Sequence, residues 1–214
     1  MISLAQLLHR YAEALVQRDG HRMGPEHHRA LWALQACHTE QCGRLHYQCP
    51  DCREPLDRYA SCGHRFCPAC QHHHNQQWLQ RQRHKLLPGN YYLVTFTLPA
   101  ALRGVCWRHQ QAGYQALFQA ASQTLQQFAR NDPTLGGQLG MTAVLHTHSR
   151  QLTYHPHVHV VVPGGTLNGT LWKARNRRYL FNGKALARVF RAKFLTRLRQ
   201  QGIQLPAGIT ADWV

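Results

Sequence analysis

Seven of the eight cysteines in this 214-residue chain lie between residues 37 and 70, and this cluster constrains the fold more than any other feature of the sequence. It contains two C-x-x-C pairs, Cys49/Cys52 and Cys67/Cys70, each with a proline directly after its first cysteine. One such pair brings two thiolates to an ion from a tight turn, and two pairs complete a tetrahedral site. These four cysteines therefore predict a structural Zn²⁺ ion in a ribbon-like domain. The alternative, a set of buried free cysteines, leaves the pairing unexplained.

The other cysteines and histidines of this region are candidates for a second zinc site, and their spacing does not select among them. The candidate ligands are Cys37, Cys42, Cys62, His46 and His64. A closed four-ligand site has no open position for chemistry. We therefore expect this domain to shape and stabilise a DNA-binding surface.

The charge balance indicates a polyanionic partner. Lys and Arg number 25 against 9 acidic residues, which gives a formal net charge of +16 and a pI near 10.2. Such a field attracts nucleic acid, and the stretch KARNRR supplies Lys173, Arg175, Arg177 and Arg178 as candidate DNA contacts. No stretch approaches the roughly 20 apolar residues of a membrane span, and the first residues lack a signal-peptide pattern. We expect a cytoplasmic, DNA-associated protein with no membrane partner, in which disulfides are disfavoured.

Hydrophobic periodicity predicts an α+β chain with two domains. Two helices are expected before residue 36, and another follows the cysteines and ends at LPGN, residues 87–90. We place a zinc-binding domain with its leading helices at 1–88 and a second domain at 90–214. In the second, YYLVTFTLP, GMTAVLHTH and TYHPHVHVVV are predicted strands, the last two antiparallel neighbours, and YLF (179–181) is a further short strand. Amphipathic helices at 114–128 and 186–198 would flank this antiparallel sheet.

Three histidines alternate along one predicted strand. Residues two apart on a strand share a face, so His157 and His159 can hold one metal ion while the intervening valines enter the core. A third ligand is needed, either His155 on the same strand or His146 on its neighbour. Neutral imidazole suits Mn, Zn, Fe or Ni, and tolerates Mg when the substrate supplies oxygens. The alternative is a row of solvent-exposed histidines on a half-buried strand.

The string HPHVHVVVPGG (155–165) resembles the His-hydrophobic-His strand of the HUH endonucleases, in particular the two-tyrosine rolling-circle transposases of bacterial insertion sequences, the IS91 group. Other segments are similar to that family in the same order: YASCGHRFCPACQ to its zinc knuckle, LVTFTLP to its first palm strand, GMTAVLHTH to the strand before the HUH motif, and LFNGKALARVFRAKFLTRL to the following helix. The similarity spans nearly the whole chain, and a zinc knuckle together with an HUH strand is more specific than either alone.

The resemblance implies a chemistry. Mg²⁺ or Mn²⁺ on His157 and His159 would polarise the scissile phosphate of single-stranded DNA at a transposon end. A tyrosine would then attack, leaving a 5′-phosphotyrosine and a free 3′-OH. The basic surface and exposed aromatic residues would hold the strand.

The chain also departs from the family. The nucleophiles of the family are two tyrosines one helical turn apart, downstream of the region of resemblance, and no two tyrosines here are four residues apart. Tyr154 and Tyr179 lie outside that context, so no catalytic residue is assigned, and we interpret the chain as a C-terminally truncated or split transposase with an incomplete palm. Phe66 stands where the family has His, and His148 where it has Trp. Whether this chain cleaves DNA is left open.

Two rival interpretations follow from the same residues. One is a non-catalytic, zinc-dependent DNA-binding remnant that occupies transposon ends. The other is a histidine-triad nucleotide hydrolase with His157 as nucleophile, which the zinc domain and the net charge disfavour, because such enzymes act on small nucleotides and need neither.

Overall fold

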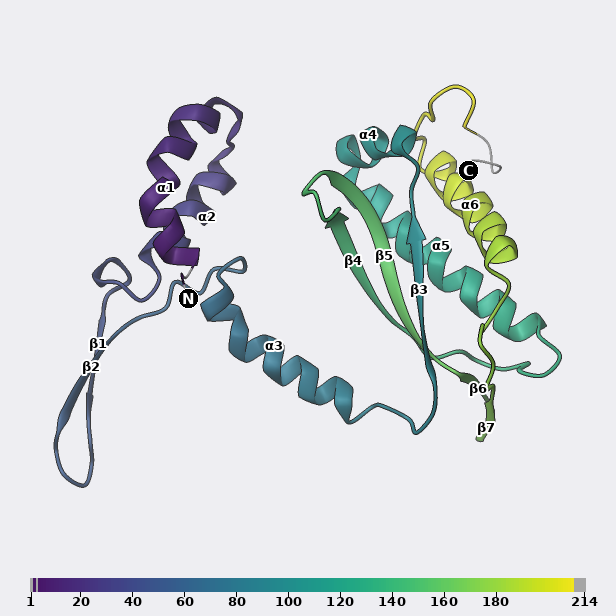
Figure 1. The fold of residues 1–214 in the computed structure, drawn as a ribbon, viewed down its shortest axis with the longest axis horizontal. Coiled ribbons are helices and arrows are strands. Elements are labelled where there is room, and N and C mark those ends of the chain that lie inside the picture. The colour runs from purple at the N-terminus through teal and green to yellow at the C-terminus, as the bar shows by residue number, and fades with distance from the viewer. Residues whose placement is uncertain (1, 3, 210–214) are drawn as a thin grey trace. The chain divides into compact units, whose positions relative to one another are not determined.

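The computed structural model describes residues 2 and 4–209, and the chain divides into two compact units, Met1–Leu86 and Leu87–Val214. Figure 1 shows the helices and strands of each. We call the first the N-terminal unit and the second the palm. The N-terminal unit holds the clustered cysteines, and the palm holds a three-stranded antiparallel sheet with helices, so the predicted α+β class is confirmed.

The N-terminal unit begins with two packed helices, α1 (Leu4–Asp19) and α2 (Pro25–Ala36), joined through the short 3-10 turn η1 (Gly20–Arg22). Pro25 is the first residue of α2, where its missing N–H removes no helical hydrogen bond. Ala12, Ala33 and Ala36 are buried, and small side chains of this kind allow close approach of helices.

A hairpin and a third helix complete this unit. After η2 (Glu40–Cys42), strands β1 (Arg44–Gln48) and β2 (Pro55–Tyr59) pair antiparallel, with Arg44 opposite Tyr59 and every strand residue exposed. Helix α3 (Pro68–Arg83) starts directly at the second C-x-x-C pair, since Cys67 is its N-cap residue. Its residues include no buried side chain.

The palm is built on strands β3 (Tyr91–Thr97), β4 (Thr142–His148) and β5 (Tyr154–Pro163) in the order β3-β5-β4, with both pairs antiparallel. The predicted pairing of the two histidine-bearing strands is therefore confirmed. Val158, Val160 and Val162 are fully buried, which fixes the central strand in the core. Strand β3 forms one edge of this sheet.

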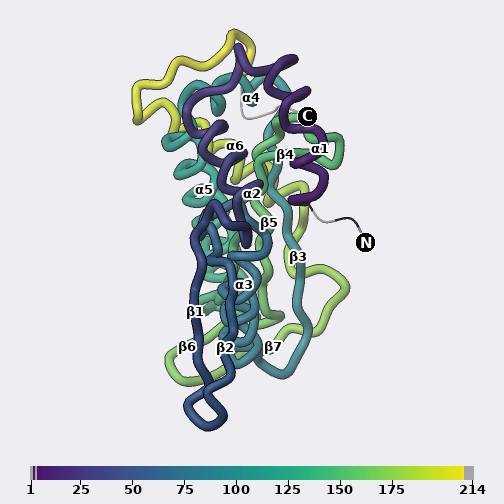
Figure 2. Tube along the Cα trace, turned by 90° about the vertical axis from the view of Figure 1, so that its left-hand side faces the viewer, coloured from purple at the N-terminus to yellow at the C-terminus, as the bar shows by residue number. Residues whose placement is uncertain are grey.

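Helices cover one face of the sheet, as Figures 1 and 2 both show for α5 and α6. Helix α4 (Ala100–Arg108) leads into the long α5 (Gln110–Asn131), which packs against the last helix, α6 (Gly183–Gln200). The fully buried side chains Leu117, Leu125 and Phe194 lie in this layer. The opposite face of the sheet carries the alternating histidines.

One predicted strand is absent and one hairpin was missed. Residues 179–181 form no strand; they belong to an irregular segment that precedes α6. The missed hairpin lies earlier in the chain, where β6 (Gly165–Asn168) and β7 (Leu171–Ala174) pair antiparallel. A two-residue turn joins them, and its Gly169 has a φ of 59°. Glycine adopts that conformation without strain. In the described part of the chain, no helix is long and apolar enough to cross a membrane.

Candidate metal centres

Four cysteine sulfurs converge in the N-terminal unit. Those of Cys37, Cys62, Cys67 and Cys70 all lie within 4.8 Å of one another, and the shortest sulfur–sulfur distances run from 3.4 to 3.6 Å. A Zn²⁺ ion about 2.3 Å from each corner of a tetrahedron needs sulfur–sulfur edges of about 3.8 Å. A slight expansion of the cluster would therefore admit the ion.

The packed thiols differ in acidity. Burial raises the pKa of Cys37 and of Cys62. Burial acts in the same direction on Cys70, but hydrogen bonds from Cys37, Cys62 and Cys67 outweigh it and lower the pKa of Cys70 to about 7. Cys70 is thus near the midpoint of its ionisation at neutral pH, and zinc would stabilise all four cysteines as thiolates while releasing their protons.

The structure groups the cysteines differently from the two-knuckle prediction. Cys67 and Cys70 cluster with two other cysteines. Cys37 directly follows α2, and Cys62 follows β2. Cys49 and Cys52 lie in the turn that joins β1 to β2 (Figure 1), whereas the cluster lies beyond the opposite end of the hairpin. Five-residue strands extend for about 16 Å. The hairpin therefore separates the first knuckle from the second, although the sequence spacing is that of a zinc ribbon.

The remaining candidates for a second zinc site are dispersed. Cys42 ends η2, His46 lies on β1 with its Nδ1 2.6 Å from Asp57, and Nδ1 of His64 accepts a hydrogen bond from the Phe66 amide. None of the three belongs to the four-sulfur cluster.

A second cluster lies on the open face of the palm sheet. His146 on β4 is paired directly with His157 on β5, and His159 follows two residues along. Their ring centroids are 4.5 to 5.3 Å apart, and one nitrogen from each ring lies within 4.8 Å of the others. Of the two proposed third ligands, His146 joins the cluster and His155 remains outside it.

In two of these rings, Nδ1 forms a hydrogen bond within the protein. Nδ1 of His157 donates to the backbone carbonyl of His155 at 2.7 Å, and Nδ1 of His159 lies 3.0 Å from Oγ1 of Thr95 on β3. Interactions of this type fix the tautomer and orientation of metal-binding histidines. They leave Nε2 of each ring as the nitrogen available to an ion. Sequence reasoning missed Thr95: it predicted the strand that contains this residue, but the pairing of that strand with β5 comes from the structure.

The pKa values of two histidines on β5, His155 and His159, are lowered. Burial, followed by the charges of His146 and His157, lowers the pKa of His159. Burial also lowers the pKa of His155, assisted by Arg103 and then His157. Neutral imidazole is the form that binds metal.

The two tyrosines near the motif lie in different environments. Tyr154 follows the alternation of β5 onto the helix-covered face, where its hydroxyl lies 3.0 Å from that of Tyr114 on α5. Burial, together with the hydrogen bond to Tyr114, raises its pKa. Tyr179 is 67% exposed in the segment before α6.

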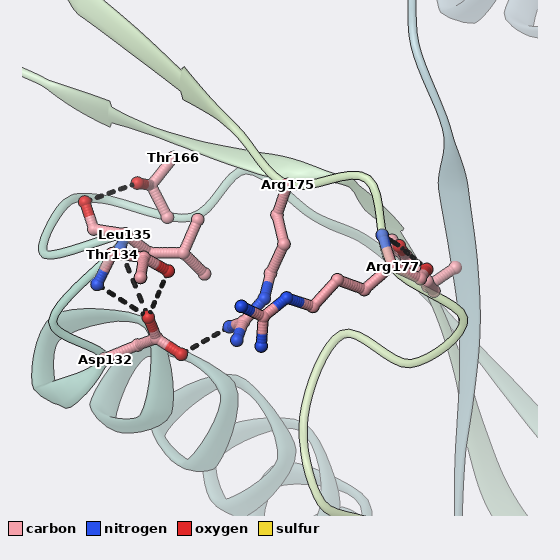
Figure 3. Close-up of polar contacts among 7 residues, drawn as sticks. Asp132, Thr134, Leu135, Thr166, Arg175 and Arg177 are labelled. Carbon is pink, nitrogen blue, oxygen red and sulfur yellow. Dashed lines mark hydrogen bonds and ion pairs between the residues drawn. The ribbon is translucent and has the colours of Figure 1, made fainter.

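The basic side chains of the stretch after β6 differ in their burial and pairing. Arg175 is 12% exposed and forms an ion pair with Asp132, as Figure 3 shows. Asp132 also accepts hydrogen bonds from the backbone and hydroxyl of Thr134; although burial acts to raise its pKa, these hydrogen bonds and Arg175 lower it to about 2. Arg177 and Arg178 are exposed, and Lys173 on β7 is half-buried.

Comparison with known proteins finds family models that match two segments of the chain. Residues 7–98 match the family model described as "Transposase zinc-binding domain", and residues 140–211 match the one described as "Putative transposase". The chain is 35% identical to "Putative transposase y4qJ" of Sinorhizobium fredii, over 92% of this chain and 50% of that protein. It is 33% identical to the transposase for insertion sequence element IS801 of Pseudomonas savastanoi pv. phaseolicola, over 65% of this chain and 34% of that protein. The chain thus spans half or less of the length of these relatives.

Solved structures with a similar arrangement include two of the conjugative relaxase TrwC with DNA. The metal-free complex with OriT DNA is 24% identical with a TM-score of 0.43, over 54% of this chain and 46% of that one. The complex with a 27-mer comprising the recognition hairpin and the cleavage site is 22% identical with a TM-score of 0.44, over 56% and 48%.

Proposed function

Because the chain belongs to the IS91 family of transposases, we propose that it binds single-stranded DNA at transposon ends and positions one phosphate at a divalent metal held by His146, His157 and His159. The observation that supports this most directly is the convergence of three imidazoles, two of them with Nδ1 already bound to the protein. Such a set presents nitrogens to an ion and leaves other coordination positions open to phosphate oxygens.

The residues of the palm do the positioning. Thr95 and the carbonyl of His155 hold two rings in place, and the buried valines of β5 keep the strand rigid. A bound Mg²⁺ or Mn²⁺ would supply Lewis-acid stabilisation of charge on the phosphate. Because burial and the neighbouring histidines lower the pKa of His159, this ring favours the neutral form that binds a metal.

We infer that the N-terminal unit binds a structural zinc ion through Cys37, Cys62, Cys67 and Cys70. The ion would join the end of α2 to the start of α3. Few apolar side chains are buried in this unit, so the metal would supply much of its folding free energy. The four-sulfur cluster has no open position, which limits its role to structure.

Two separate single substitutions test the metal site. The His157→Ala chain should lose Mn²⁺ binding in calorimetry, whereas His155→Ala, on the same strand and face but outside the cluster, should retain it. Zinc content should stay the same in both, because the two clusters share no residue. Equal Mn²⁺ affinity in His157→Ala and the unmodified chain would contradict the proposal.

A covalent-adduct assay tests the chemistry. The purified chain is mixed with Mn²⁺ and a 3′-labelled single-stranded hairpin from a transposon end, then run on a denaturing gel. A labelled band that His157→Ala abolishes means that this chain cleaves DNA with a tyrosine of its own.

The second candidate function is DNA binding without cleavage. It is favoured by the position of Tyr154, which is half-buried and whose hydroxyl contacts Tyr114 on the helix-covered face of the sheet. In this case the same DNA shifts in a native gel, Mn²⁺ strengthens the shift, and no covalent band forms.

A further inference from the structure

A large hollow lies in the palm, outside the histidine cluster. It has a volume of about 1170 Å³ and is bounded by the last turn of α5, the irregular segment before α6, and the first turn of α6. Among its lining residues are Arg177, Arg178, Tyr179 and Lys184. A cavity of this size is large enough for a nucleotide.

The hollow has a surplus of positive charge. Asp132 is the only acidic residue between positions 87 and 209, and it is committed to Arg175 and Thr134. In Figure 3 the side chain of Arg177 extends toward Arg175 and the carboxylate of Asp132. One carboxylate therefore faces several cations, so an anionic group would be bound favourably here.

The segment that carries these cations is fixed to the sheet. The hydroxyl of Tyr92 on β3 donates to the carbonyl of Arg177 and accepts from its amide at 3.2 Å. Two residues on, the ring of Tyr179 is exposed, and the guanidinium carbon of Arg178 lies 5.5 Å from its centroid. Adjacent cations and an exposed aromatic ring are the combination that holds single strands, with phosphates on the cations and bases on the ring.

A second hollow adjoins the first and extends to Thr95 on β3. It has a volume of about 310 Å³, shares Arg178 and Tyr179 with the first, and is also lined by Leu93 and Thr95 of β3. Thr95 is the residue that contacts His159. Because β3 is an edge of the sheet, no further strand among the described residues separates the two hollows from the histidine face. From Tyr92 to Thr95 the strand rises about 10 Å, which a few nucleotides span.

We propose that one DNA strand passes from the histidine cluster over the edge of β3 into this hollow, where Arg177, Arg178 and Lys184 bind its phosphates and Tyr179 stacks on a base. This path rests on the proposed function, since it begins at the phosphate that the histidines position. Arg175 has a different role from the one expected from sequence: its pairing with Asp132 makes it part of the wall that shapes the hollow.

Binding of fluorescently labelled (dT)16 tests the path. Tyr179→Ala should weaken binding about 5- to 160-fold, the range for removal of one base–aromatic stack. The double variant Arg177→Ala/Arg178→Ala should weaken binding and reduce the slope of log K against log salt by about 1.4, because each phosphate neutralised on a single strand adds about 0.7 to that slope. Arg199→Ala, an exposed cation in the last turn of α6, is the matched control and should leave the affinity within about twofold and the slope nearly unchanged.

Mn²⁺ titrations on the same variants separate this proposal from the one on which it rests. If the Tyr179 and Arg177/Arg178 variants bind (dT)16 like the unmodified chain while His157→Ala weakens binding, the path is refuted and the metal site stands. If the hollow variants lose binding but His157→Ala and Mn²⁺ have no effect, the hollow is a DNA site and the metal proposal fails. Displacement of (dT)16 by an equal concentration of dTMP would mean a site for free nucleotides and would also refute the path.

Discussion

Replacing Asp132 by Asn should destabilise the palm by about 2 kcal/mol at neutral pH. The carboxylate is 16% exposed, pairs with Arg175, and accepts three hydrogen bonds from Thr134 and Leu135. Its pKa falls from 3.8 to about 2, and each unit of difference between the folded and unfolded states is worth about 1.4 kcal/mol. Asn retains an oxygen for the backbone hydrogen bonds but lacks the charge opposite the guanidinium.

The loss of stability in Asp132→Asn should depend on pH. The folded-state pKa lies below the unfolded value, so the stabilisation is complete above about pH 4 and is lost as the pH falls toward 2. The unmodified chain should therefore exceed Asp132→Asn in stability by about 2 kcal/mol at pH 7 and by only about 0.4 kcal/mol at pH 2.

Urea unfolding followed by tryptophan fluorescence measures this difference. Replacing the exposed Trp32 and Trp78 of the N-terminal unit by Phe restricts the signal to the palm. Arg175→Met should cause a similar decrease in stability, and the double variant with Asp132→Asn should lose less than the sum, because the two residues share one interaction. A stability difference that is the same at pH 7 and pH 2.5 would refute the electrostatic reasoning and indicate a steric defect instead.

Three further outcomes are expected. Thr95→Val should lower Mn²⁺ affinity about 10- to 100-fold by releasing the ring of His159, whereas Thr97→Val should not; equal calorimetric affinities for both would show that the Thr95 hydroxyl is unimportant. Cys62→Ser should abolish stoichiometric zinc binding, measured by atomic emission, and should unfold the N-terminal unit, whereas Cys49→Ser should retain the ion. Loss of zinc from Cys49→Ser but not from Cys62→Ser would support the two-knuckle grouping instead. Tyr154→Phe should cost about 1 kcal/mol of palm stability by removing its hydrogen bond and leave Mn²⁺ binding unchanged; weaker Mn²⁺ binding would place this hydroxyl in the metal site.

The palm strands could be predicted because each has a strong local pattern. In β5 the histidines alternate with buried valines, and this period of two assigns both faces without knowledge of the partners. The short S-R-Q-L-T-Y connection also made an antiparallel neighbour the simplest arrangement for β4. The strand predicted at 179–181 failed because an apolar triplet has no comparable periodicity, and its residues instead line the hollow before α6.

Ligand groupings were harder to predict because they depend on three-dimensional distances. Spacing alone favoured Cys49 and Cys52 as partners of the second knuckle, but the extended hairpin puts them at its turn. Cys37 joins the cluster because α2 ends beside the start of α3. Likewise, His155 and His146 were equivalent candidates in the sequence, and the register of β4 against β5 places His146 in the cluster.

The spread of the two clusters along the chain determines the order in which they can form during synthesis. Cys37 and Cys70 are 33 residues apart, so the sulfur cluster is complete as soon as α3 begins to leave the ribosome. Thr95 and His159 are 64 residues apart, and β3 has no partner in its sheet until β5 follows. A nascent chain can therefore close its zinc site and fold its N-terminal unit while the histidine site has yet to be translated. Premature termination between Cys70 and His146 would release a chain with every ligand of the first site and none of the second.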